Sequence, residues 1–442
     1  MSAHLDTLDH LLRAARAAGA DAADALFVNG ASLSVQRRLG KVEQVERAEG
    51  QDIGLRVFVG RRSAIVSTTD PTPSGFAALA ERAVAMAGAV PEDPHGGLPE
   101  RATGTIPALD LADAEEPEVA ALLARAAAAE DTALGVKGVT NSEGADASWS
   151  RTRIALAATN GFSGEYTRAS HSISVTALAG TGTGMERDYD YASATHLADL
   201  EDAATLGRLA AEQAVARLNP QRPATASLPV VFSPRVAGSL LGHLASAING
   251  ASVARGTSFL RDSMGQRVLA AGLTVRDDAT RARGLRSRPF DGEGVPARAQ
   301  SLVEDGVLTS WVLDARSARQ LGLTTTGHAA RGVSSPPSPS TTNLWLEPGA
   351  MTPEALMADI TLGIYVTELI GMGVNGVTGD YSRGAAGFMI RNGEIAEAVS
   401  GFTIAGNLKD MFTRMAPAND LRFRRGTDSP TVRIDGMMIA GG

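Results

Sequence analysis

A single histidine stands in a segment that has the pattern of a packed helix. The stretch PRVAGSLLGHLASAING, residues 234–250, begins after Ser233 and repeats its apolar residues at helical spacing. Zinc hydrolases often carry two histidines and a glutamate on one helix, because that spacing places two ligands and a general base together. His243 has no second histidine three to five positions later, and no glutamate follows it. This chain alone is therefore not expected to form a metal site, and the alternative is a polar residue on a packed helix.

Nucleophilic catalysis is the second chemistry that the residue types allow. The chain has no cysteine, which excludes disulfides, thiolate catalysis and cysteine metal ligands. Ser258, Thr378 and Ser382 lie in turn-like positions beside glycines, and His243 or His328 would have to serve as the base. Because no GxSxG motif accompanies them, hydrolysis by serine or threonine is the least favoured interpretation.

Carboxylates and glycines offer two further motifs. The pair Asp277-Asp278 and the group Asp291-Gly292-Glu293 could act in acid–base chemistry or bind calcium, but a capped turn between strands is the favoured interpretation. The glycine-rich stretch GMGVNGVTGD, residues 371–380, lacks the lysine and hydroxyl residue that end a phosphate-binding loop. From its residues alone, the chain has no active site of its own.

The charge balance restricts the partners. With 41 basic and 49 acidic residues the net charge is −8, which argues against nucleic-acid binding. The two basic runs, RARGLRSR at 281–288 and RFRR at 422–425, are predicted to be solvated loops or strand edges. No apolar run approaches the roughly 20 residues of a membrane span, and the N-terminus lacks the pattern of a signal peptide. We expect a cytoplasmic protein that binds neither nucleic acid nor membrane.

The elements that must position these residues form two parts. Residues 1–222 are expected to fold as an α+β domain of two units, each a meander of strands followed by a helix. In the first unit, short strands over 24–69 are separated by turns at Asn29-Gly30, Leu39-Gly40 and Gly60.

Residues 223–442 have a different sequence pattern, in which glycines separate short apolar strands. They predict a mainly-β domain, either a sandwich or a barrel-like sheet, with few helices. Helices are expected at 234–249 and in TIAGNLKDMFTRM. The segment 328–346 is rich in proline, serine and threonine, and we expect a surface loop without regular structure that crosses a groove or a subunit boundary.

Several segments together resemble one family. RGTSFLRDSMGQRV, DDATRARGLRSRPFDGEG, TNLWLEPGAM and VTGDYSRGAAGFMIRNGEI follow one another in the order and spacing of the TldD/PmbA family. The resemblance spans nearly the whole chain, is densest from 229 to 442, and is greatest to the PmbA (TldE) branch. An older description of this family is modulator of DNA gyrase.

The resemblance implies where a metal would be held in a relative. In the TldD branch, a zinc peptidase, the ligands are an HExxxH helix and a cysteine near the C-terminus. The stretch 234–250 is the counterpart of that helix, but Gly242 stands at the first histidine, His243 at the glutamate and Ala247 at the last histidine. The resemblance therefore implies a degenerate motif, with no catalytic residue and no metal ligand in this chain.

A partner role follows from the same resemblance. The chain is expected to be the noncatalytic subunit of a heterodimeric zinc metalloprotease that acts on unfolded or small peptides, with the zinc in a TldD-type partner. The alternative is a homodimeric module that binds peptides or proteins without proteolysis. Side chains expected to line a substrate chamber are His243, His328, Thr378, Asp380 and Ser382.

Overall fold

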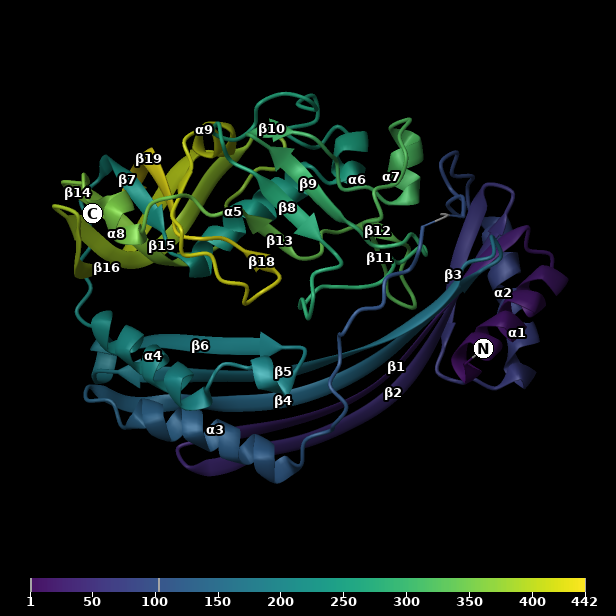
Figure 1. The fold of residues 1–442 in the computed structure, drawn as a ribbon, viewed down its shortest axis with the longest axis horizontal. Helices are drawn as coiled ribbons and strands as arrows, with labels where there is room; N and C mark the ends of the chain where they lie inside the picture. The colour runs from purple at the N-terminus through teal and green to yellow at the C-terminus, as the bar shows by residue number, and fades with distance from the viewer. Residues whose placement is uncertain (1, 102–103, 442) are drawn as a thin grey trace.

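The N-terminal part is one long, curved antiparallel sheet (Figure 1). The computed structural model describes residues 2–101 and 104–441. The sheet has the order β3-β2-β1-β4-β5-β6. Its strands are β1 (Ala22–Arg38), β2 (Lys41–Val59), β3 (Arg62–Thr68), β4 (Val139–Ala158), β5 (Ser163–Ala179) and β6 (Glu186–Ala194). The two expected units therefore share a single sheet, since β1 pairs with β4.

The predicted turn at Asn29-Gly30 is wrong, whereas the turns at Leu39-Gly40 and Gly60 are confirmed. Strand β1 runs straight through Asn29 and Gly30, because β2 and β4 pair with it on both sides and satisfy its backbone groups. At Leu39, Gly40 and Gly60 the backbone has φ of 47°, 78° and 58°. This left-handed conformation is what a tight hairpin turn requires.

Four helices cover the sheet in pairs, at opposite ends (Figure 1). They are α1 (Ala3–Ala17), α2 (Phe76–Ala89), α3 (Val119–Leu134) and α4 (Ala203–Ala216), with short 3-10 turns at Pro73–Gly75, Gly182–Gly184 and Leu197–Asp199. The pair α1 and α2 buries Leu8, Phe27 and Ile53. The pair α3 and α4 buries Trp149 and Ile173. Alanine-rich faces let these helices pack closely and leave the sheet with two separate cores.

The C-terminal part contains two larger sheets. A six-stranded sheet has the order β16-β15-β14-β7-β19-β17, and an additional pairing of β16 with β19 closes it into a barrel-like ring. Its strands are β7 (Ala226–Phe232), β14 (Leu362–Ile370), β15 (Asp380–Arg391), β16 (Glu394–Asn407), β17 (Ala416–Pro417) and β19 (Val432–Ala440). The second sheet has the order β10-β9-β8-β13-β18. Its strands are β8 (Val275–Asp278), β9 (Ala299–Glu304), β10 (Val307–Leu308), β13 (Leu344–Leu346) and β18 (Thr427–Asp428).

Helices are few and mostly short in this part, so the predicted fold class, an α+β domain followed by a mainly-β domain, is confirmed. Both expected helices form, and three more of five or six residues join them. The helices are α5 (Pro234–Ala247), α6 (Gly250–Ala254), α7 (Ala315–Gln320), α8 (Pro353–Met357) and α9 (Leu408–Thr413). The three additional helices are too short to give a clear period in the sequence.

The segment 328–346 lies where the two parts meet. It contains a small antiparallel pairing of β11 (Ala329–Ala330) with β12 (Ser338–Pro339), and strand β13 lies at its end, so the expectation of no regular structure is wrong at these seven residues. Gly54 of β2 approaches this segment so closely that a Cβ there would lie 2.0 Å from the carbonyl oxygen of Val333. We call the contact between the N-terminal sheet and the C-terminal part the interdomain seam.

A search of the helices in residues 2–101 and 104–441 finds none with the length and apolar character needed to cross a membrane.

Candidate functional site

Helix α5 carries the histidine that the sequence singles out. It begins directly after Ser233, and Pro234 at its first position is pre-set for helical φ. Its buried residues include Leu240, Leu241 and Leu244, and the helix contacts β14 on one side and β13 and β18 on the other. The helix is thus the packing layer between the two C-terminal sheets.

His243 is half-buried on α5 and faces an aromatic ring. Its imidazole meets Tyr381 of β15 edge-on, with ring centroids 5.8 Å apart and planes at 78°. Nε2 of His243 and the hydroxyl of Tyr381 are both buried without a hydrogen-bond partner among the described residues. Burial lowers the pKa of His243, and the nearby charge of Arg383 lowers it further. The imidazole is therefore neutral at pH 7.

The residues around this helix do not fit a zinc ion. Gly242 and Ala247 offer no donor atom, and the sequence has no cysteine. A catalytic zinc site uses three protein ligands and one open position, whereas α5 supplies one imidazole. In the described parts of the chain, no three or more His, Asp or Glu side chains gather in a way that could hold a metal. That the chain binds no zinc stays a prediction.

Thr378, Asp380 and Ser382 are brought together, but away from His243. All three are exposed, whereas Tyr381 between them is buried against His243, because successive strand residues point to opposite faces. The Thr378 hydroxyl donates to Oδ2 of Asp380 at 2.6 Å, and Asn407 Nδ2 donates to Oδ1 at 3.1 Å. These bonds, that from Thr378 first, lower the pKa of Asp380. The carboxylate is held by these two side-chain bonds and is a poor general base.

His328 lies in a third place, fully buried near the second sheet. Its Nδ1 is 2.8 Å from the Thr326 hydroxyl and its Nε2 is 3.2 Å from Oδ1 of Asp277. A hydroxyl, an imidazole and a carboxylate in a row have the order of a catalytic triad. However, His328 and Asp277 are each 1% exposed, and Asp277 also accepts the backbone N–H of Thr342 at 2.6 Å. Because His328 and Asp277 are buried in this way, we assign Thr326, His328 and Asp277 a structural role and not a catalytic one.

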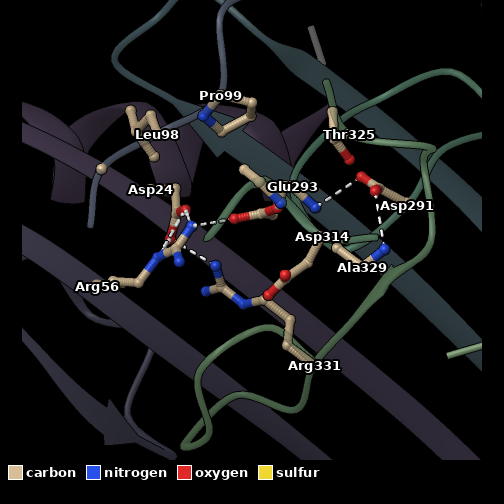
Figure 2. Close-up of polar contacts among 12 residues, drawn as sticks. Asp24, Arg56, Leu98, Pro99, Asp291, Glu293, Asp314, Thr325, Ala329 and Arg331 are labelled. Atoms are coloured by element: carbon tan, nitrogen blue, oxygen red, sulfur yellow. Dashed lines mark hydrogen bonds and ion pairs between the residues drawn. The ribbon is translucent and has the colours of Figure 1, made fainter. Parts of the chain in front are cut away.

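A buried ionic cluster joins the two domains at the interdomain seam (Figure 2). Asp24 of β1 accepts from Nε of Arg56 at 3.0 Å and from Nη1 of Arg331 at 2.6 Å. Arg56 Nη2 also lies 3.5 Å from Oε1 of Glu293. All four side chains are at most 8% exposed. We call Asp24, Arg56, Glu293 and Arg331 the seam cluster.

The carboxylates of the cluster are in different protonation environments. Burial alone would raise the pKa of Asp24, but the charges of Arg56 and Arg331 outweigh it and lower that pKa. Burial raises the pKa of Glu293 to about 7, against the opposing charge of Arg56. Burial also raises the pKa of Asp291, which accepts the backbone N–H groups of Glu293 and Ala329. We therefore expect the interdomain contact to respond to the protonation of Glu293 near pH 7.

The seam cluster was not found from the sequence, although a signal for it exists. Asp24 and Arg56 each interrupt an apolar run, in AADALFV and IGLRVFV. A charge within a run that predicts a buried strand requires a partner. The Asp291-Gly292-Glu293 group does form a capped turn, as expected from the sequence, but its carboxylates are buried at the seam.

Three comparisons place this architecture among known proteins. Residues 23–87, 108–218 and 225–441 match domain 1, the central domain and the C-terminal domain of the PmbA/TldA metallopeptidases. The chain is 36% identical over 426 residues to Metalloprotease PmbA of Escherichia coli O157:H7, covering 95% of this chain and 92% of the relative. It is 34% identical to Metalloprotease PmbA homolog of Haemophilus influenzae, covering 92% of this chain and 90% of the relative.

Solved structures share the fold over the full length. A protein named a modulator of DNA gyrase from Bacteroides thetaiotaomicron matches with a TM-score of 0.90 and 23% identity, covering 100% of both chains. TldE from Thermococcus kodakarensis matches with a TM-score of 0.89 and 19% identity, covering 98% of this chain and 100% of that chain.

Proposed function

This chain belongs to the PmbA/TldD family, and on that premise we propose that it is the noncatalytic subunit of a cytoplasmic zinc metalloprotease. In this proposal the metal and the catalytic groups belong to a TldD-type partner chain, and the complex cleaves unfolded or small peptides. The chain described here contributes walls and substrate contacts, not ligands.

One observation supports the proposal: α5, which the family resemblance makes the counterpart of the metal-binding helix of TldD-type chains, lacks the donor side chains of such a helix. Gly242 and Ala247 have no donor side chains, and His243 is neutral and packed edge-on against Tyr381. A lone imidazole without an adjacent carboxylate supplies neither a zinc site nor a general base.

The architecture suits a partner of this kind. A long curved sheet and a β-rich domain meet along the interdomain seam and leave cavities of about 590 and 630 Å³ between them. Cavities of this size are in the range that proteins use to hold ligands. A paralogue without its own chemistry can still exclude folded proteins and hold an extended peptide for its partner.

Reconstitution tests the proposal. The purified chain is expected to contain less than one-tenth of an equivalent of zinc and to leave an unstructured peptide uncleaved. Adding the TldD-type chain of the same organism is expected to restore both the metal and the cleavage. The His243→Ala variant of this chain serves as a control and is expected to support cleavage by the mixture as the unmodified chain does. One equivalent of zinc in the isolated chain, with cleavage that His243→Ala abolishes, would overturn the proposal.

A further inference from the structure

A cavity of about 630 Å³ lies at the interdomain seam, and its N-terminal wall is one face of β5. Tyr166, Arg168 and Ser170 stand at alternate positions of that strand, so they share a face. The other face of β5 carries Ile173 and Val175 against the helices α3 and α4. Figure 1 shows β5 and β6 in the layer that faces the C-terminal domain.

The opposite wall comes from the C-terminal domain and unites the two basic runs of the sequence. Arg286 and Arg288 come from the run 281–288, and Arg425 comes from the run 422–425. Ser340, Thr341 and Thr342 of the proline-rich segment add hydroxyl groups. From the sequence, both runs are predicted to be solvated loops or strand edges. The structure brings three of their arginines to one cavity, together with Arg168 from the other domain.

The positive charge of the arginines that line this cavity is not balanced by a carboxylate in the same lining. Its lining contains four arginines and no carboxylate, and none of the four forms an ion pair with a residue that the structure describes. Their hydrogen bonds go to neutral oxygens: Arg168 to the Leu285 carbonyl, Arg288 to the Ala329 carbonyl, Arg286 to the Thr427 hydroxyl and Arg425 to the Tyr191 hydroxyl. Most of the five N–H donors of each guanidinium remain for a ligand or water.

Arg288 is the clearest case of an unused donor. Its Nε and Nη2 atoms are buried and have no hydrogen-bond partner in the described chain. Buried polar groups are nearly always paired, so two orphan donors on one guanidinium indicate a missing partner. Nε and Nη2 form one edge of the guanidinium fork, which matches the two oxygens of a carboxylate.

The walls are held in place before any ligand arrives. Asp277 accepts the Thr342 backbone N–H at 2.6 Å, and the buried His328 contacts the same carboxylate. The side chain of Asn343 accepts the backbone N–H of Arg286 at 3.0 Å. Binding groups fixed by supporting hydrogen bonds lose little freedom when a ligand binds.

A neighbouring cavity, which shares Arg425, has a different charge balance. The cavity of about 590 Å³ also contains arginines, but Arg235 pairs there with Asp188 at 2.5 Å. Arg424 pairs with Glu201 at 2.6 Å and with Asp190 at 3.3 Å. A lining with four arginines and no carboxylate thus distinguishes the cavity of about 630 Å³ from this neighbour, whose lining includes Asp188 and Asp190.

We propose that the cavity lined by Arg168, Arg286, Arg288 and Arg425 binds carboxylate groups of acidic peptides. The proposal rests on the proposed function, because peptides are the substrates assigned to the complex there. It deepens that function by giving this chain a selectivity of its own: acidic segments are retained and neutral or basic ones are not. A free oxyanion such as phosphate offers similar chemistry, and the test separates the two.

The test is a titration of the full chain by fluorescence anisotropy, with fluorescein-labelled tetraglutamate and tetraglutamine peptides. We expect tetraglutamate to bind at least about tenfold more tightly in low salt, and the preference to shrink as salt screens the charges. Inorganic phosphate is expected to displace the peptide only weakly. Equal binding of the two peptides would overturn the proposal, and phosphate binding more tightly than tetraglutamate would assign the cavity to a free oxyanion instead.

Charge-matched variants locate the site. Arg286→Gln and Arg168→Gln are each expected to weaken tetraglutamate binding about tenfold, the value of one charge-assisted hydrogen-bonding group. Arg82→Gln, on the exposed face of α2, removes the same charge elsewhere and is expected to change binding less than twofold. A loss in Arg82→Gln equal to the others would reduce the effect to net charge and overturn the site.

The folding of each variant is checked by its thermal transition, and Arg286 is exposed, so its replacement leaves the core intact. The binding assay needs neither zinc nor the partner chain. Failure here therefore leaves the reconstitution result standing, and failure of reconstitution leaves the binding result standing.

Discussion

Two groups of arginines lie along the interdomain seam, and their surroundings differ. In the seam cluster, Arg56 and Arg331 are buried against Asp24, and Glu293 lies beside Arg56. In the cavity lined by Arg168, Arg286, Arg288 and Arg425, which we call the arginine cavity, Arg168 and Arg288 donate to backbone carbonyl oxygens and form no ion pair with a carboxylate of the described chain. Adjacent segments build both groups, since Arg288 precedes Glu293 by five positions.

The two groups of arginines differ in the role we assign to them: the seam cluster joins the two domains, and the arginine cavity binds a ligand. The charge of a buried arginine is compensated by a buried carboxylate even where, as in Arg331, Nε and Nη2 have no hydrogen-bond partner among the described residues, and removing the carboxylate leaves an uncompensated charge. The seam cluster therefore fixes the two domains relative to each other. An arginine without a carboxylate keeps its charge available, and its unpaired donors favour an anionic ligand. The interdomain seam thus contains one group of arginines that fixes the two domains and another that recognises an anionic ligand.

Removing the carboxylate at the centre of the seam cluster is the largest expected change. Asp24→Ala leaves Arg56 and Arg331 buried without their partner, and we expect a loss of about 3–5 kcal/mol in the free energy of unfolding. Urea denaturation measures it. Arg168→Gln in the arginine cavity is the matched comparison and is expected to cost less than about 1 kcal/mol. Equal losses in the two variants would remove the distinction between the two groups.

Protonation of Glu293 gives the next effect. Its pKa is raised from an ordinary value of 4.5 to about 7 by burial. Its contribution to stability is therefore complete below pH 4.5 and is lost as the pH rises through 7, amounting to at most about 3 kcal/mol. Urea midpoints from pH 5 to pH 8 should fall in the unmodified chain more steeply than in Glu293→Gln. Parallel curves for the two proteins would contradict this role.

Close backbone approach at the seam is tested by a pair of glycines in β2. Gly54→Ala places a Cβ 2.0 Å from the Val333 oxygen, so the two domains must shift. We expect a loss of about 1–3 kcal/mol. Gly50→Ala is the control, because nothing lies within 4 Å of a Cβ there. If thermal unfolding shows no difference between the variants, the seam is not tightly packed at this point.

Replacing His243 should have the smallest effect. Its Nε2 is buried without a partner among the described residues, so His243→Leu is expected to leave the free energy of unfolding within about 1 kcal/mol of the unmodified chain. Leu244→Ala on the same helix, by contrast, should cost about 2–5 kcal/mol. A loss above 2 kcal/mol in His243→Leu would reveal a partner for the imidazole and reopen the question of a metal.

The sequence is sufficient for the elements whose signals are local. The start of α5 follows from the preference of proline for the first helical position, and the turns at Leu39-Gly40 and Gly60 follow from turn preferences. The continuity of β1 through Asn29-Gly30 does not, because pairing with β2 and β4 on both sides overrides a local turn signal.

Site prediction has the same limit. His243 is found on the expected helix, and its lack of a ligand pair is evident from spacing alone. The contact of Arg331 with Asp24 joins residues 307 positions apart, and the meeting of Arg286 with Arg425 depends on how two loops fold back on the seam. Local patterns carry no information about such long-range contacts, which is why the sequence predicts both basic runs to be solvated loops or strand edges.

The most direct test of the central claim is native mass spectrometry of the tagged chain, purified gently from its own cells. The account predicts a complex of this chain with one distinct second chain and one zinc ion, and no zinc on this chain when the complex is separated. A metal-free homodimer without any second chain would contradict the assignment as a protease subunit and favour a homodimeric binding module. Zinc that stays with this chain after separation would contradict its noncatalytic role.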